Sequence, residues 1–458
     1  MYISQWKKKK LIVISFVNMF SIPCKRNGEL MDTQESTNSR YIRDIVLMVV
    51  STGWRVAFII GFNVLFNLHL LKLGFAEDKI GFIIASASII IAIVIIPLGF
   101  YADRLFQRNH KSRKYLVIIG TTILSIGMLI MPWMRSFSLI VIFNGITGFG
   151  RAIMLVASGP LIQQYADHHK RIRKIVFQLM WIGIYVGSIA GGLIGGNLPS
   201  WLEPIFGDDA LAKATQILGA VIFIGIIPLY FVRTPKSDPI EPVKQKLTKI
   251  IPIVSGAQFL LILPMAIVSS FANLYFVENK GLSKENFGLI VSLIPILGLL
   301  ITFLNIYLTQ KIMRWSNAML FAMLAFPMII ILNLDGIIIP AIGFAFAQSF
   351  LEAGFPLLTG IMMSNAHPSN RSTIRSFGMF SGHLARSIGT IIGGLIIFHL
   401  SWLYLYLFAA FFTLVAVFYN IFVLRRIELD TKVYNKRESK TQFISNIGSS
   451  RHEAVTLK

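Results

Sequence analysis

The stretch GFYADRLFQRNHKSRK, residues 99–114, begins where the long uncharged run 80–100 ends. It holds a single carboxylate, that of Asp103, among five basic side chains: Arg104, Arg108, Lys111, Arg113 and Lys114. A basic cluster that starts this abruptly is typical of the point where a hydrophobic helix leaves a membrane on its positively charged side. The stretch therefore predicts a membrane-spanning helix that ends near residue 100.

The composition of the whole chain indicates the same class of protein. The 458 residues are 55% hydrophobic and only 14% charged, and the mean hydropathy is +0.69. Soluble domains are about one quarter charged, so we expect an integral membrane protein that has the lipid bilayer as its solvent. Cys24 is the only cysteine, which excludes an intrachain disulfide and a cysteine-based metal site.

Apolar runs long enough to cross about 30 Å of hydrocarbon as helices recur along the chain. Helices are expected because a lone backbone strand would leave its polar groups unpaired in lipid. The sequence thus predicts an all-α membrane protein with twelve spans, at 45–69, 80–100, 115–133, 138–162, 175–197, 214–232, 251–277, 286–309, 317–334, 337–361, 376–398 and 402–424.

The distribution of lysine and arginine predicts the orientation. Segments expected on the cytoplasmic side hold 34 of the 43 basic residues, whereas the six outer loops together hold six. The positive-inside rule then places both termini in the cytoplasm of a plasma-membrane protein. This topology accounts for the net charge of +22, so no nucleic-acid partner is expected.

Internal similarity divides the chain into two halves. Gly187-Ser-Ile-Ala-Gly-Gly-Leu-Ile in the fifth predicted span resembles Gly389-Thr-Ile-Ile-Gly-Gly-Leu-Ile in the eleventh, and Asp78-Lys-Ile-Gly resembles Glu285-Asn-Phe-Gly. Two parallel six-helix repeats are a transporter architecture with the substrate site between them. The predicted organisation is an N-terminal tail (1–43), a first bundle (44–232), a cytoplasmic linker (233–250), a second bundle (251–424) and a C-terminal tail (425–458). The N-terminal tail is expected to be cytoplasmic rather than a cleaved signal peptide.

The stretch 99–114 carries a resemblance to a known family. A Gly, three residues, an Asp-Arg pair and a further basic residue, here Gly99, Asp103, Arg104 and Arg108, resemble the signature of the major facilitator superfamily between its second and third helices. The sequence departs from that signature at Phe106, where a second glycine is usual. The resemblance covers about residues 44–426 and implies the two-bundle fold of that family.

The resemblance also implies a role for the signature. Asp103 is expected to accept hydrogen bonds at the N-terminus of the eleventh helix, whose positive dipole end lies on the same side of the membrane. Arg104 is expected to pair with Asp167 at the end of the fourth helix. These contacts would join the two halves when the cytoplasmic side is closed. The plain alternative is an ordinary basic loop.

Glycines in the fifth and eleventh spans repeat at intervals of four and five residues. Such a stripe lets a neighbouring helix approach closely, either as simple packing or as a seam along which helices slide. The fifth span resembles the family's antiporter motif, with Ser188 in place of its proline. The stripe consists of Gly183, Gly187, Gly191, Gly192, Gly389, Gly393 and Gly394.

Four charged residues fall near the middle of predicted spans, where each costs about 3 kcal/mol on insertion scales. Glu352 and Arg386 form an ion pair between neighbouring helices, or else Glu352 carries the coupled proton. Arg55 and Arg151 either extend their charges to the interface or line a positive substrate cavity. We place Asn63, Asn273 and His383 in that cavity as well.

These features favour a monomeric secondary transporter that moves a small solute by alternating access with proton coupling. The partial antiporter motif favours efflux, and the alternatives are uptake of a small organic anion and flipping of a lipid headgroup. The chain is not expected to be an enzyme or to carry a cofactor or a metal, since it has no P-loop and no cluster with metal-ligand spacing.

Overall fold

The computed structural model describes residues 31–168, 173–235, 250–311, 314–364 and 371–426, and within these ranges the chain is helical and has no strand. Its first part forms α2 (Met31–Lys72), α3 (Glu77–Arg108), α4 (Ser112–Ile130), α5 (Phe137–His168), α6 (Arg173–Phe206), α7 (Ala210–Val221) and α8 (Ile227–Phe231). A 3-10 segment, Ile222–Ile226, joins α7 to α8.

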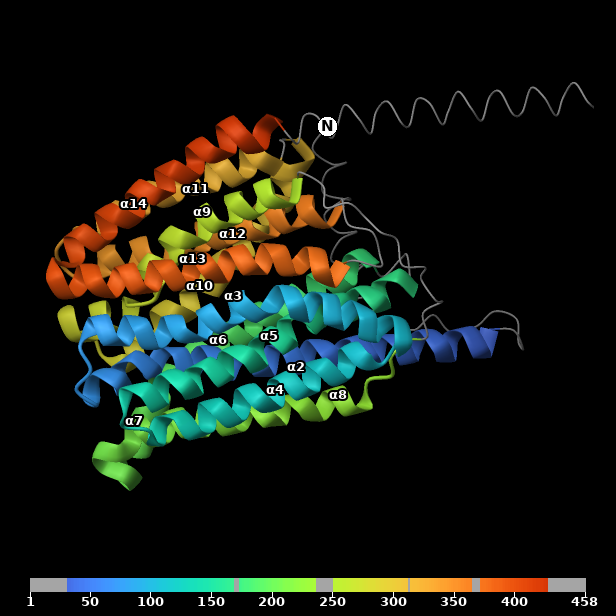
Figure 1. The fold of residues 1–458 in the computed structure, drawn as a ribbon, viewed down its shortest axis with the longest axis horizontal. Coiled ribbons are helices and arrows are strands. Elements are labelled where there is room, and N and C mark those ends of the chain that lie inside the picture. The colour runs from blue at the N-terminus through green and yellow to red at the C-terminus, as the bar shows by residue number, and fades with distance from the viewer. Residues whose placement is uncertain (1–30, 169–172, 236–249, 312–313, 365–370, 427–458) are drawn as a thin grey trace, which may run out of the picture. The chain divides into compact units, whose positions relative to one another are not determined.

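The second part forms α9 (Ile250–Ser269), α10 (Lys284–Lys311), α11 (Arg314–Ile330), α12 (Ile338–Ser364), α13 (Arg371–His399) and α14 (Trp402–Tyr419). Wider π-helical turns follow α9 at Leu274–Asn279 and α14 at Asn420–Leu424. The helices of residues 45–458 run roughly alongside one another (Figure 1).

Eleven helical stretches within the described residues are long and apolar enough to cross a membrane. One of them, Leu179–Phe231, has 53 residues and covers most of the fifth predicted span and nearly all of the sixth. At about 1.5 Å per residue it is far too long for a single crossing of about 30 Å. Gly207, with φ of 51°, marks the turn between α6 and α7. The all-helical membrane fold is confirmed, whereas the count of twelve spans rests on dividing this stretch at that turn.

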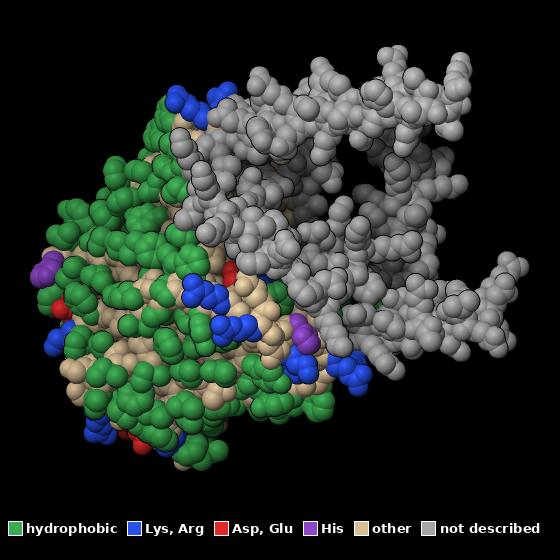
Figure 2. Space-filling view, turned by 45° about the vertical axis from the view of Figure 1, so that its right-hand side comes forward, with side chains coloured by type: hydrophobic (Ala, Val, Ile, Leu, Met, Phe, Trp, Pro, Cys, Tyr) green, Lys and Arg blue, Asp and Glu red, His purple; other side chains and the backbone are tan. Residues whose placement is uncertain are grey.

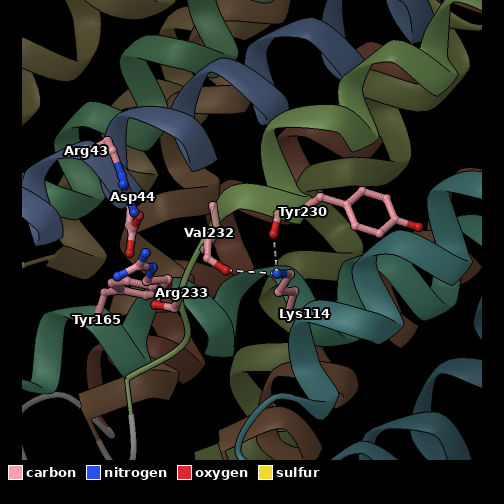
Figure 3. Close-up of polar contacts among 7 residues, drawn as sticks. All are labelled: Arg43, Asp44, Lys114, Tyr165, Tyr230, Val232 and Arg233. Carbon is pink, nitrogen blue, oxygen red and sulfur yellow. Dashed lines mark hydrogen bonds and ion pairs between the residues drawn. The ribbon is translucent and has the colours of Figure 1, made fainter.

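The chain divides into two compact units, Met1–Asp44 and Ile45–Lys458. In the first unit, residues 31–44 are helical and the guanidinium of Arg43 lies 2.9 Å from the carboxylate of Asp44 (Figure 3). Both predicted bundles belong almost entirely to the second unit. The linker predicted at 233–250 lies mostly outside the described residues, so the division into two bundles stays a prediction.

Packing in the second unit pairs helices that are distant in sequence. α3 lies against α13 and α6 lies against α10, which joins the two predicted halves along two seams. Within each half, α4 packs on α5, and α11 packs on α12 and α14. The seams therefore follow the internal repeat, because they join the second span to the eleventh and the fifth to the eighth.

Hydrophobic side chains cover much of the described surface seen in Figure 2. Ile93 is 64% exposed, Phe303 60% and Phe411 58%, although each lies well inside a long helix. Exposed apolar side chains over whole helices indicate a surface that contacts lipid. The composition and this surface agree on a protein that spans the membrane several times.

Candidate functional site

Asp103 joins the two halves at one end of the second unit. We call this the basic end: there α3 ends, α4 begins, and residues 104–114 carry five basic side chains. One carboxylate oxygen of Asp103 accepts hydrogen bonds from the backbone N–H of Thr373, at 3.0 Å, and from its hydroxyl, at 2.9 Å. Thr373 lies in the first turn of α13, where backbone N–H groups have no partner within the helix. The hydrogen bonds expected for Asp103 are therefore present, while their role as a gate stays a prediction.

The contacts around Asp103 give a structural reason for the residues at positions 99, 106 and 113. Its other oxygen lies 3.5 Å from the guanidinium of Arg113, which stacks over the ring of Phe106 at 3.5 Å from the centroid. Phe106, the departure from the family signature, thus contacts the guanidinium that faces the carboxylate of Asp103. Gly99 is required nearby, because a Cβ at this position would collide with Ser376 of α13.

The other two basic residues of the signature lie outside this contact. Arg104 and Arg108 are exposed. The side chain of Asp167 lies outside the described residues, so the pairing of Arg104 with Asp167 stays a prediction.

Two further basic residues hold the basic end together, and sequence reasoning had treated both as ordinary loop charges. Lys114 donates hydrogen bonds to the carbonyls of Tyr230, at 2.9 Å, and Val232, at 2.8 Å, and so ties α4 to the end of α8 (Figure 3). Arg375 of α13 lies directly against the backbone of Gly159 in α5, where a Cβ would overlap its guanidinium. Because α13 begins at Arg371, before the predicted start at 376, Arg375 is a helix residue that links the halves.

At the opposite end, where α2 ends and α3 begins, two asparagines link the halves. The amide of Asn67 donates to the side-chain oxygen of Asn273 at 2.9 Å and to the carbonyl of Ser270 at 2.6 Å. The amide of Asn273 donates in turn to the carbonyl of Val64 at 3.2 Å. Asn273 is only 4% exposed. It therefore belongs to a buried clamp between α2 and the segment that follows α9, and its place in a substrate cavity stays a prediction.

The glycine stripe serves two different contacts. Gly183, Gly187 and Gly191 face α2 within the first half. In the second half, Gly389 faces α9, and Gly393 faces Phe271, just beyond α9, and Leu405 of α14. These five contacts lie within a half, so their glycines pack helices of the same bundle closely together.

The remaining stripe glycines lie between the halves. A Cβ on Gly192 would lie 2.9 Å from the carbonyl oxygen of Gly288, and one on Gly394 would lie 2.7 Å from that of Glu77 and 3.3 Å from the Cα of Gly81. Gly192 and Gly394 are repeat equivalents, and so are Gly288 and Gly81. The same kind of glycine contact therefore occurs in both seams. Gly192 and Gly288 make it between α6 and α10, and the equivalent Gly394 and Gly81 make it between α13 and α3.

Four ionisable side chains meet between the halves near the middle of the helices. Arg151 of α5, Glu352 of α12 and two residues of α13, His383 and Arg386, are all half-buried. Arg386 interacts electrostatically with Glu352, with Arg151 and with His383. We call these four residues the central charge cluster.

The predicted ion pair of Glu352 with Arg386 takes a looser form. Within the described residues, ion pairs shorter than 4.0 Å occur at Arg43 with Asp44 and at Arg113 with Asp103, and Glu352 is in neither. Glu352 and Arg386 therefore interact at longer range, and proton coupling by Glu352 stays a prediction.

Arg55 does not join this cluster. It is 4% exposed inside the first half, where it donates to the carbonyl of Ser51 at 3.1 Å and to the hydroxyls of Thr121 at 3.3 Å and Thr52 at 3.2 Å. Gly225 leaves the space for its stem, since a Cβ there would lie 2.8 Å from the Cγ of Arg55. The expectation that Arg55 lines a cavity is not supported, because these small and hydroxyl-bearing neighbours enclose it among α2, α4 and the 3-10 segment.

Replacing Arg55 with alanine is expected to lower stability without changing the binding of substrate. The variant loses three hydrogen bonds and leaves a cavity, a change that costs about 2–5 kcal/mol for large buried side chains. The melting temperature of the purified protein should fall by several degrees. An unchanged melting temperature would show that Arg55 contributes no packing inside the first half.

The last predicted cavity residue, Asn63, is exposed on α2. Within the described residues, no group of three or more His, Cys, Asp or Glu side chains is arranged to hold a metal ion.

These observations define a class: a multi-pass helical membrane protein whose two predicted halves contact each other at both ends, with ionisable groups between them. The sequence profile of the Major Facilitator Superfamily matches residues 45–390 and 254–456. Because these matches span most of the chain, the protein belongs to the Major Facilitator Superfamily, a family of membrane transporters.

Solved structures share this fold at low sequence identity. The bacterial homolog of the human lysosomal transporter Spinster, in an inward-facing and occupied conformation, is 13% identical with a TM-score of 0.66, covering 83% of this chain and 96% of that one. The nucleoside transporter NupG is 15% identical with a TM-score of 0.63, covering 82% and 98%. The human organic anion transporter MFSD10 is 14% identical with a TM-score of 0.58, covering 82% and 99%. No curated protein sequence matches the chain.

Proposed function

We propose that the protein is a secondary transporter of the plasma membrane that moves a small solute by alternating access, driven by protons. The observation that supports this most directly is the pair of contacts between the halves, Asp103 with Thr373 at the basic end and Asn67 with Asn273 at the opposite end. Ionisable residues lie between them at half-depth. Breaking one contact while keeping the other would open a path from the central charge cluster to one side only.

Proton coupling is assigned to Glu352. It is the carboxylate of the central charge cluster, and a carboxylate within a membrane span is expensive unless it exchanges a proton or serves a pathway. Its neighbour Arg386 comes from the adjacent helix α13. Protonation of Glu352 therefore changes the net charge between the halves by one unit.

The direction of transport has two candidates with different support. The glycines of α6, which resemble an antiporter motif, favour export. The arginines of the central charge cluster favour uptake of a small organic anion, the class of substrate named for MFSD10.

Everted and right-side-out vesicles with an imposed proton gradient test both the activity and its direction. The panel contains nucleosides, aromatic carboxylates and amphiphilic cations, and a pH-sensitive dye reports proton movement. We expect one class to exchange with or accompany protons in vesicles that contain the protein. Proton movement identical to that of empty vesicles across the whole panel would contradict proton-coupled transport.

A further inference from the structure

Two arginines of opposite halves interact electrostatically near the middle of their helices. Arg151 belongs to α5 in the first half and Arg386 to α13 in the second, and they are close enough to repel. Like charges in a medium of low dielectric constant repel strongly unless something neutralises them. When the halves approach at this point, a negative charge is needed between the two guanidinium groups.

The protein itself supplies only part of that charge. Glu352 is the carboxylate that interacts with Arg386, and Tyr185 of α6 is the other titratable side chain that senses Glu352. In the part of the chain that the structure describes, the side chains of Arg151, Arg386 and Glu352 make no hydrogen bond and no ion pair within 4.0 Å. With Glu352 ionised the three groups sum to one positive charge, and with Glu352 protonated they sum to two.

A buried polar atom points to the same place. His383 lies three residues before Arg386 on α13, so both side chains share a helix face. Its Nδ1 is buried and has no hydrogen-bond partner, while the ring interacts with both Arg151 and Arg386. A buried polar atom without a partner is costly. In the tautomer that carries its proton on Nδ1, His383 would donate a hydrogen bond to a ligand oxygen between the arginines.

An aromatic pair on α6 lies next to the cluster, with Trp181 partly exposed and Tyr185 buried against Gly298 of α10. Tyr185, which interacts with Glu352, lies 5.9 Å between ring centroids from Trp181, one turn earlier on α6. The hydroxyl of Tyr185 is fixed by the hydroxyl of Thr302 at 3.0 Å. Aromatic faces of this kind accept an apolar ligand body, while arginines bind its oxygens.

We propose that Arg151 and Arg386 jointly bind the anionic group of a small organic anion, whose apolar part contacts Trp181 and Tyr185. This rests on the proposed transport function and names its substrate class. A carboxylate, sulfonate or phosphate group has the oxygens that two guanidinium groups bind. The anion replaces the missing negative charge and so lets the two halves close around it.

Glu352 couples the proton to this anion. When ionised it competes with the anion for Arg386, and when protonated it releases Arg386 to bind the anion. The anion and the proton therefore bind to the same state of the protein instead of replacing each other. Such binding favours co-transport of the two over antiport. With a proton gradient directed inward, co-transport leads to uptake. The protonation of Glu352 is influenced directly by Arg386 and Tyr185. Arg151 and His383 influence it indirectly, because both interact with Arg386.

Binding of three probes to the purified full-length protein tests the site without any transport step. The probes are benzoate, benzenesulfonate and phenyl phosphate, each titrated up to about 10 mM while protein melting is recorded. At least one is expected to raise the melting temperature, and more strongly at mildly acidic than at mildly alkaline pH. Arg151→Gln and Arg386→Gln should each weaken that binding about tenfold or more. Arg135→Gln, at an exposed loop position, is the matched control and should bind like the unmodified protein.

The variant Glu352→Gln tests whether the carboxylate of Glu352 competes with the anion for Arg386 or only supports the structure of the site. This variant mimics the protonated state, so the anion should bind equally well at both pH values, with the affinity that the unmodified protein shows in acid. Loss of binding in Glu352→Gln would overturn the proposed competition. Absence of binding for all three probes, or binding that survives both arginine substitutions, would overturn the anion site.

A fourth probe separates two sources of the same anionic group. Dihexanoylphosphatidylglycerol carries it on a lipid headgroup, and a response to this lipid alone assigns the site to lipids rather than to soluble anions. The proposed function fails in a different way: anions bind as expected, but vesicles show no proton-linked flux of any substrate.

Discussion

Replacing Asp103 with alanine should lower the transport rate at least tenfold while the amount of protein in the membrane stays unchanged. The substitution removes both hydrogen bonds to Thr373. Hydrogen bonds to a charged group contribute about 1.5–3 kcal/mol each, so the state closed at the basic end loses roughly two or more orders of magnitude in population. Transport that must pass through this state slows accordingly.

The measurement is initial uptake in vesicles, normalised to the protein detected in the membrane. Asp103→Asn keeps an oxygen acceptor but no charge, and should lie between alanine and the unmodified protein. Glu203→Ala, which removes an exposed carboxylate, is the control and should transport normally. Normal transport by Asp103→Ala would mean that the contact with α13 is only part of an ordinary basic loop.

Glu352→Gln should abolish proton-driven accumulation of substrate yet leave exchange of substrate for substrate. Glutamine has nearly the same shape as glutamic acid but cannot release a proton, so the driving force is disconnected while the path remains. Glu352 is half-buried and interacts electrostatically with Arg386. The charge of Glu352 therefore depends on the other charged groups of the central charge cluster.

Two assays on the same vesicles distinguish these activities, one with a proton gradient and one with substrate on both sides. Glu278→Gln, an exposed glutamate that follows α9, is the matched control and should behave like the unmodified protein in both. Full accumulation by Glu352→Gln would exclude Glu352 as the coupling residue, and loss of both activities would indicate a structural role.

The fold could be predicted because long apolar runs have few alternatives in lipid. Charge placement and hydrophobic length are enough to locate helices, and the repeat around Gly192 and Gly394 indicates how they pair. The seam contacts of these glycines with Gly288 and Glu77 follow that repeat. The boundary between α6 and α7 was harder, since apolar sequence continues up to the turn at Gly207.

The site could be predicted only in part, because sequence places a residue at a depth but not on a face. Arg55 and Arg151 both lie near the middle of a span, yet only Arg151 reaches the central charge cluster. Asn273 looked like a cavity residue, and its partner Asn67 is distant in sequence, so the clamp was invisible. Arg375 was missed because a helix was expected to begin one residue after it.

The most direct test of alternating access uses two disulfides, one at each end, in a protein that carries Cys24→Ser. Asp103→Cys with Thr373→Cys links the basic end, and Asn67→Cys with Asn273→Cys links the opposite end, where side chains of each pair are already in hydrogen-bond contact. Ser86→Cys with Asn144→Cys, joined by a contact within the first half, is the control. Oxidation should stop the proton-driven transport that each inter-half variant still shows when reduced, and reduction should return it to that level. For Asp103→Cys that level is already at least tenfold below the unmodified protein, because the carboxylate is gone. The control should transport equally before and after oxidation. Undiminished transport with either inter-half disulfide formed would contradict alternating access.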